Sequence, residues 1–165
     1  MMKVAIIMGS DSDWPMLEVA EETLLSFGIE TEVVVASAHR TPDKVHDFAK
    51  GARERGVKAI IAAAGAAAAL PGVVAAYTTL PVIGVPINAT PLVGFDALLS
   101  IVQMPAGIPV GCMAVNGAKN AALFAAQILA AGDEKLAAKL SAHREQMQKE
   151  VFAKSDKLDA LRSKK

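Results

Sequence analysis

A histidine and an arginine stand side by side in the segment Ser37-Ala38-His39-Arg40-Thr41-Pro42, and they give the strongest chemical signal in the sequence. An imidazole titrates near neutral pH, so His39 can both donate and accept a proton. The Arg40 guanidinium can hold a phosphate through two parallel hydrogen bonds, with the Ser37 hydroxyl beside it. These residue types predict an acid–base group next to an anion site. An exposed loop with a surface histidine and arginine is the alternative interpretation.

A second polar stretch, Gly9-Ser10-Asp11-Ser12-Asp13, is a candidate nucleotide loop. Gly9 lets the backbone approach a ligand, and the two serines offer hydroxyls together with N–H groups at the start of a helix. A carboxylate repels phosphate, so Asp13 is better suited to ribose hydroxyls, as in dinucleotide sites. Simple N-capping by Ser12 or Asp13 explains the same residues equally well.

The stretch from Ala63 to Gly72 consists almost entirely of small residues. Such a segment after a strand presents bare backbone, against which a flat ring or a small molecule can lie. Tight packing of helices or subunits on alanine is the alternative, and both can hold together.

The remaining reactive side chains are less promising. Cys112 is the only cysteine, which excludes an intrachain disulfide, and its place within a predicted strand indicates a small buried hydrophobe. His46 is expected on a helix surface and His143 among the charges of the last helix. The three histidines lack the spacing of a shared metal site, so we predict no metal.

Length, net charge and composition limit which kinds of protein this chain can be. The 165 residues suggest one domain, and 17 basic against 17 acidic residues give zero net charge, which predicts neither nucleic-acid nor membrane binding. The N-terminus lacks the layout of a signal peptide, and no apolar run reaches spanning length, so we expect a cytoplasmic protein. The abundance of alanine is a hint of a homo-oligomer, although an alanine-rich core has the same composition.

Apolar runs and helical patterns alternate along the chain, which predicts an α/β fold with a parallel sheet covered on both faces. We expect a three-layer doubly wound sheet of flavodoxin-like strand order, in a single domain over 1–165. The sheet core takes up about 1–131, followed by a C-terminal helical extension over about 133–161. Expected strands are 3–8, 30–35, 57–62, 81–85 and 110–115; expected helices are about 13–27, 42–56, 73–78, 95–103 and 118–131.

A parallel sheet is expected to bring the two polar loops, residues 9–13 and 37–42, to the same edge. His39 and Arg40 directly follow a predicted strand, and Thr41 and Pro42 are suited to cap and begin the next helix. Ligands of open α/β sheets bind at the carboxyl ends of the strands, where the Gly9–Asp13 loop also lies.

Five motifs, taken in order, make the pattern recognisable. They are Met8 to Trp14, Ser37 to Pro42, Leu70-Pro71-Gly72, Ser100 to Pro105 and Lys119 to Ala122. Over nearly its whole length the chain resembles the bacterial N5-carboxyaminoimidazole ribonucleotide mutases of purine biosynthesis. The resemblance implies an isomerase that moves a carboxylate from the exocyclic nitrogen of its substrate to the neighbouring ring carbon. It also implies no cofactor and a homo-octamer with active sites at subunit junctions.

Carried over by position, the resemblance gives His39 as the catalytic proton shuttle. It places Ser10 and Asp13 on the nucleotide, Asp13 through the ribose, and Ser12, Ser37 and Arg40 on the phosphate. The remaining substrate-binding residues implied are Ala64, Gly65, Ala66 and Leu70. The apolar loop from Met104 to Pro109 is suited to closing the site over released carbon dioxide.

The third motif departs from the family pattern at two positions. Ala66 replaces a glycine and Ala69 replaces a histidine, whereas Leu70-Pro71-Gly72 argues against the animal-type relatives that use carbon dioxide directly. An active mutase is the expectation, and a weakened or inactive nucleotide-binding paralogue is the alternative. A flavin- or nucleotide-binding module and a purely structural oligomer are rival hypotheses, the latter leaving His39 and Arg40 unexplained.

Overall fold

The computed structural model describes residues 2–162, except for the side chain of residue 160. Five parallel strands form one sheet in the order β2-β1-β3-β4-β5, which confirms the flavodoxin-like prediction. The strands are β1 (Lys3–Met8), β2 (Glu30–Val35), β3 (Val57–Gly65), β4 (Val82–Ile87) and β5 (Gly111–Cys112). The helices are η1 (Asp11–Asp13, a 3-10 turn), α1 (Trp14–Ser26), α2 (Pro42–Gly51), α3 (Leu70–Tyr77), α4 (Phe95–Val102), α5 (Ala118–Ala130) and α6 (Glu134–Arg162).

The two central strands, β1 and β3, are apolar over residues 4–8 and 59–65, where helices cover both of their faces. From Val4 to Met8, every side chain of β1 is at most 1% exposed. Met8 pairs with Val35 of β2 on one side and with Ala63 of β3 on the other. The first two strands therefore end at the same level, and β3 continues two residues past it.

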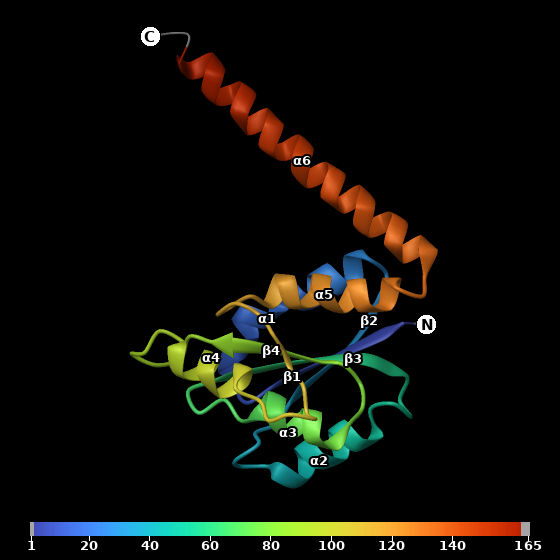
Figure 1. Cartoon of the computed structure of the whole chain (residues 1–165), viewed down its shortest axis with the longest axis vertical. Coiled ribbons are helices and arrows are strands. Elements are labelled where there is room, and N and C mark those ends of the chain that lie inside the picture. The colour runs from blue at the N-terminus through green and yellow to red at the C-terminus, as the bar shows by residue number, and fades with distance from the viewer. Residues whose placement is uncertain (1, 163–165) are drawn as a thin grey trace. The chain divides into compact units, whose positions relative to one another are not determined.

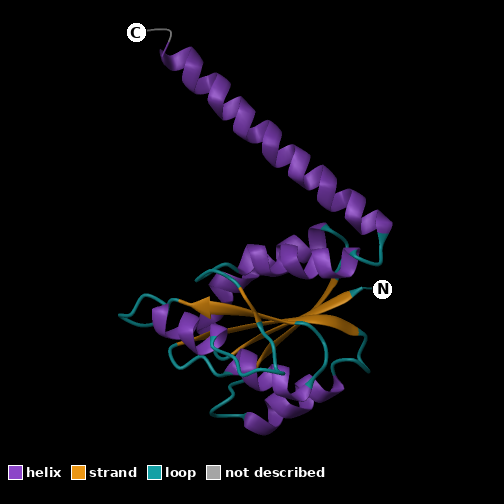
Figure 2. Ribbon diagram, in the orientation of Figure 1, coloured by secondary structure: helices purple, strands orange, loops and turns teal. Residues whose placement is uncertain are grey.

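Helices form a layer on each side of the sheet. Figure 1 shows α1 and α5 on one face and α2 and α3 on the other, and Figure 2 shows the strands between these layers. Helix α4 shares the second face, since Ala97 and Ile101 belong to the same core cluster as Val45 of α2 and Val74 of α3. This confirms the three-layer doubly wound architecture.

Five elements differ from the prediction by two residues or more. Helix α2 ends at Gly51, not near 56, because residues 52–56 form turns that end on Gly56 with a positive φ of 84°. Strand β4 ends at Ile87, two residues later than expected, because it pairs with β3 as far as Gly65.

Strand β3 continues to Gly65, three residues further than expected, because its ladder with β4 extends as far. Helix α3 begins at Leu70, not at residue 73, because Pro71 lies in its first turn, where its missing N–H is not needed. Strand β5 spans only Gly111–Cys112, since the chain turns away beyond Met113, with a Gly117 N–H bond to the Ala114 carbonyl.

The last helix belongs to a second compact unit, which begins at Ala130, whereas the first ends at Leu129. Asp133 caps α6, because its Oδ1 accepts a hydrogen bond of 2.8 Å from the Leu136 N–H. Nearly all described side chains of α6 are exposed, including the apolar Val151 and Phe152. Within residues 2–162, no helix is both long and apolar enough to cross a membrane.

Candidate active site

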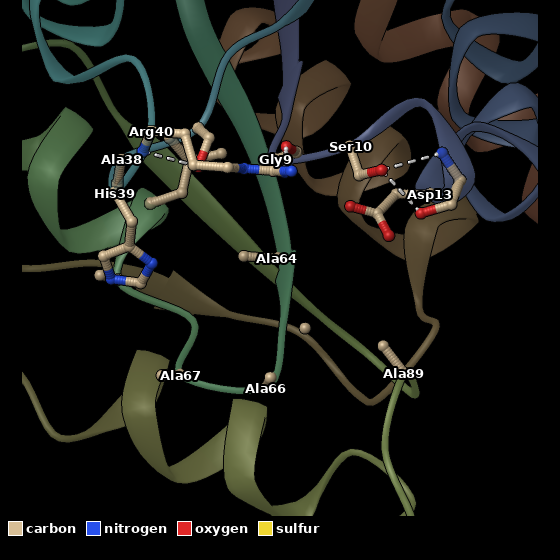
Figure 3. A pocket seen from close by; sticks show the side chains of 15 residues that line it. Gly9, Ser10, Asp13, Ala38, His39, Arg40, Ala64, Ala66, Ala67 and Ala89 are labelled. Carbon is tan, nitrogen blue, oxygen red and sulfur yellow. Dashed lines mark hydrogen bonds between the residues drawn. The ribbon is translucent and has the colours of Figure 1, made fainter.

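A cavity of about 330 Å³ opens at the carboxyl ends of β1, β2 and β3 (Figure 3). Every site residue predicted from the sequence lines this cavity. His39 and Asp13, predicted to share a site, both line it. A cavity of this size suits a small ligand. The lining residues are Gly9, Ser10, Ser12, Asp13, Ser37, Ala38, His39, Arg40, Ala64, Gly65, Ala66, Ala67, Ala69, Leu70 and Ala89.

The loop after β1 supplies the first wall. The Ser10 hydroxyl caps the short turn η1, accepting hydrogen bonds from the Ser12 N–H at 3.3 Å and the Ser12 hydroxyl at 2.8 Å. Asp13 precedes α1 at the N-cap position, yet its side chain makes no capping bond. The predicted side-chain capping of α1 by Ser12 or Asp13 is therefore not found: Ser10 caps the turn η1 that precedes α1, and the Asp13 carboxylate is not used to begin the helix.

Asp13 is only 7% exposed, so its charge is poorly solvated. Burial raises the pKa of its carboxyl, the neighbouring Asp11 adds to the rise, and a backbone hydrogen bond at Ser10 partly opposes it. Hydrogen bonds stabilise the charged form of a buried carboxylate, and neutral donors can provide them without a second charge being buried. Sugar hydroxyls that entered the cavity would be such donors.

The loop after β2 forms the second wall and is braced from within. The Thr41 hydroxyl accepts a bond of 2.9 Å from the Ser37 N–H and donates to the Ser37 carbonyl at 3.2 Å. Thr41 does precede α2, as predicted, but this bracing turns its side chain away from a capping bond. Arg40 Nη2 reaches the Gly9 carbonyl at 3.0 Å, which ties the second loop to the first.

His39 is exposed and its ring faces the cavity (Figure 3). Among the described residues, no hydrogen bond to its ring nitrogens is found, so both nitrogens remain available to a ligand. The Arg40 guanidinium extends from the same loop across the cavity, toward the loop that carries Ser10 and Asp13. A proton-transfer group and a fixed cation therefore open into one space.

The segment after β3 forms the third wall. Ala66 has φ 53°, a left-handed conformation that costs an L-residue about 1–2 kcal/mol and that glycine adopts freely. Gly65 allows β3 to lie close to the loop after β4, because a Cβ there would stand 2.6 Å from the Ala89 Cβ. Ala69 lines the cavity directly before α3, with its methyl where the resembling family has an imidazole.

Five lining residues were not among the predicted site residues. Gly9 and Ala69 had been discussed from the sequence, whereas Ala38, Ala67 and Ala89 had not been singled out. An alanine methyl group gives no chemical sign of function in a sequence. Ala89 nevertheless lies in the loop after β4, and loops at the carboxyl ends of parallel strands are where ligands bind. The predicted closing loop from Met104 to Pro109 does not line the cavity within this chain. Most of it is exposed, and Met104 lies against Gly72 of α3.

The cavity therefore combines a proton carrier, a cation and hydroxyl donors with an apolar wall. This set can bind a phosphorylated sugar and move a proton on the group attached to it. No group of three or more His, Cys, Asp or Glu side chains within residues 2–162 is placed to hold a metal ion.

Comparison with known proteins gives consistent matches. The model of the family described as AIR carboxylase matches residues 3–150. The N5-carboxyaminoimidazole ribonucleotide mutase of Thermotoga maritima is 51% identical over 98% of this chain and 94% of its own length. The protein of the same name from Bacillus subtilis is 54% identical over 94% of this chain and 97% of its own. The crystal structure of Treponema denticola PurE superposes with a TM-score of 0.86 at 31% identity, covering 96% of this chain and 99% of that one.

Proposed function

The chain belongs to the AIR carboxylase family, and on that premise we propose how its cavity carries out the family's chemistry. Its activity is that of a mutase of purine biosynthesis, which converts N5-carboxyaminoimidazole ribonucleotide to 4-carboxy-5-aminoimidazole ribonucleotide. Identities near one half over almost the full length favour this active enzyme over a binding paralogue. The observation that carries the proposal is the single cavity shared by His39, Arg40 and Asp13.

The phosphate of the nucleotide lies against Ser12, Ser37 and Arg40 in this proposal. Arg40 is already held in place by the Gly9 carbonyl and by the Ser37 hydroxyl, 3.4 Å from Nε. A guanidinium carries five N–H donors, so these bonds leave others for phosphate oxygens. Because the side chain is fixed before binding, little conformational entropy is lost when the phosphate enters.

The ribose lies against the first loop. The Asp13 carboxylate accepts hydrogen bonds from the ribose hydroxyls, and these bonds offset the free-energy cost of burying its charge. Ser10 is the second nucleotide-binding residue of this loop. The imidazole base then lies on the third wall, where Ala64, Gly65 and Ala66 offer backbone and methyl groups, with Leu70 completing the surface.

His39 moves the proton. The carboxylate leaves the exocyclic nitrogen as carbon dioxide, and that nitrogen takes a proton from the imidazolium of His39. The neighbouring ring carbon then attacks the carbon dioxide, and the neutral imidazole removes the proton from that carbon. One histidine returns to its starting state, since no net proton is consumed. The apolar methyls of the third wall favour retention of uncharged carbon dioxide.

The surroundings of the site belong to the same proposal. The partner is the small nucleotide, with no nucleic acid and no membrane, and the enzyme works in the cytoplasm. Copies of the chain assemble as a homo-octamer with sites at subunit junctions. Support comes from large apolar side chains that are exposed in the single chain between β4 and the start of α4, such as Leu92 (60%), Val93 (67%) and Phe95 (61%).

Turnover is the direct test. The purified chain is expected to convert the carboxyamino nucleotide to the carbon-linked isomer, and His39→Asn to lose this activity by at least ~10²-fold, as expected when an acid–base group is removed. Since asparagine keeps hydrogen-bonding capacity, the variant should still bind the product in calorimetry. Unchanged turnover in His39→Asn would remove His39 from the mechanism, and no product from the unaltered chain would overturn the proposed activity.

A further inference from the structure

A second cavity adjoins the first on the other side of Arg40. It encloses about 350 Å³, and it shares Gly9, Ser10, Ser37 and Arg40 with the active-site cavity. Its remaining walls come from the end of β2 and the start of α2. The residues that it does not share are Asp11, Val35, Ala36, Thr41 and Lys44.

The charge of the substrate exceeds what the first cavity offers. A phosphate monoester carries nearly two negative charges at neutral pH. Among the residues that line the first cavity, Arg40 is the one lysine or arginine, and Asp13 lies across from it. Lys44 is the one lysine among those of the second cavity. A phosphate seated on Arg40 therefore has a second cation, Lys44, in the adjoining cavity, among whose lining residues the carboxylate of Asp11 is the one acidic group.

The Lys44 ammonium is positioned in advance. Its Nζ donates a hydrogen bond of 2.8 Å to the Val35 carbonyl, at the last residue of β2. An ammonium has three donors, so two remain for a ligand. This bond holds the charge at the carboxyl edge of the sheet, one helical turn beyond Thr41 and Arg40, although the lysine is otherwise exposed.

We infer that Lys44 is a further phosphate-binding residue of the mutase reaction, supplying the second positive charge that Arg40 alone lacks. The inference rests on the proposed function, because it assumes a phosphorylated substrate in the first cavity. Lys44 acts on the phosphate, which is remote from the reacting nitrogen and carbon, so its contribution is the same in the ground state and the transition state. Such uniform binding changes KM and leaves kcat alone.

The test compares Lys44→Met with Lys50→Met, which removes the same charge from the same helix but lines a different cavity. We expect KM for the carboxyamino nucleotide to rise ~3- to 10-fold in Lys44→Met, the range of a solvent-exposed charged hydrogen bond, with kcat within ~2-fold of wild type. Lys44→Arg should restore most of the lost affinity. Lys50→Met should behave as wild type.

A binding arm separates a phosphate contact from a structural role. In calorimetry, Lys44→Met should weaken binding of the product nucleotide but leave binding of the corresponding nucleoside, which lacks the phosphate, unchanged. Equal KM values in the two methionine variants, or equal losses for nucleotide and nucleoside, would overturn the inference. If the unaltered chain binds the nucleotide without turning it over, the mutase proposal fails and this comparison still decides the role of Lys44. No binding of either compound would overturn both.

Discussion

Asp13 is nearly buried at the rim of β1, and burial raises the pKa of its carboxyl above the ordinary value. The charged form is therefore less favourable in the folded chain than in the unfolded chain. Below the unfolded pKa both states are protonated, and Asp13 costs no stability. As pH rises through the folded pKa, the folded state must carry the charge, and the cost reaches its full size.

Asp13→Asn is accordingly expected to raise the free energy of unfolding at pH 7, with the gain shrinking toward zero as the pH falls below about 4. Urea denaturation of wild type and variant across this range measures it, with Glu22→Gln on the exposed face of α1 as the matched control. The same variant should bind nucleotide more weakly, because an amide is a poorer acceptor for ribose hydroxyls. A pH-independent difference from wild type would contradict the burial argument.

Ala69 is a second single residue whose replacement is expected to affect catalysis. It lines the cavity with an ordinary φ of −72° at the start of α3, so a histidine there requires no change of backbone. Ala69→His would place a second imidazole in the cavity that His39 already serves. We expect kcat to rise by clearly less than the ~10²-fold that a primary acid–base group supplies. Equal rates for both chains would deny that position a catalytic role.

At the scale of elements, the turn between β3 and α3 carries strain. Ala66 holds a left-handed φ of 53°, whereas its neighbour Ala67 does not. Replacing Ala66 by glycine removes about 1–2 kcal/mol of steric cost and adds about 0.4–1 kcal/mol of unfolded-state entropy. We expect Ala66→Gly to stabilise the fold by up to about 1.5 kcal/mol and to raise Tm by ~2–4 °C for each kcal/mol gained.

Thermal unfolding of Ala66→Gly beside Ala67→Gly separates the two effects. The control keeps only the entropic loss and should therefore melt below wild type. If both variants shift Tm in the same direction, the turn is not strained at Ala66.

The elements also show which features a sequence can reveal. Strands β1 and β2 were predicted to the residue, because an apolar run, residues 4–8 in β1 and 33–35 in β2, ends abruptly at a polar loop. The predicted start of α3, at residue 73, was three residues late, because the first turn of a helix tolerates a proline such as Pro71. The length of β5 depends on where its neighbour stops pairing, which is a tertiary property with no local pattern.

The predicted site residues were found together because parallel strands deliver their following loops to one edge. Ser37, His39 and Arg40 could be selected by chemistry as well as by position. Ala89 could be selected by position only, and the bond from Arg40 to the Gly9 carbonyl needed coordinates. The roles of all these residues stay predictions until variants are measured.

At the scale of the whole molecule, the proposed octamer has a simple expected signature. Sedimentation or light scattering should give eight times the chain mass of 17.1 kDa. Apolar side chains of α6 are exposed in the single chain, among them Val151 at 62% and Phe152 at 66%, so a double change of these two to aspartate should lower the mass. Glu145→Gln on the same helix is the control, and a monomeric wild type would contradict the proposal.

The brevity of β5 bears on how copies of the chain can meet. A sheet edge with several unpaired backbone groups invites another chain to continue it, which is a common route to aggregation. Here only Gly111 and Cys112 form that margin. A neighbour would find almost no main-chain template to extend, so any association of copies at this side would rely on side-chain packing and not on continuation of the sheet.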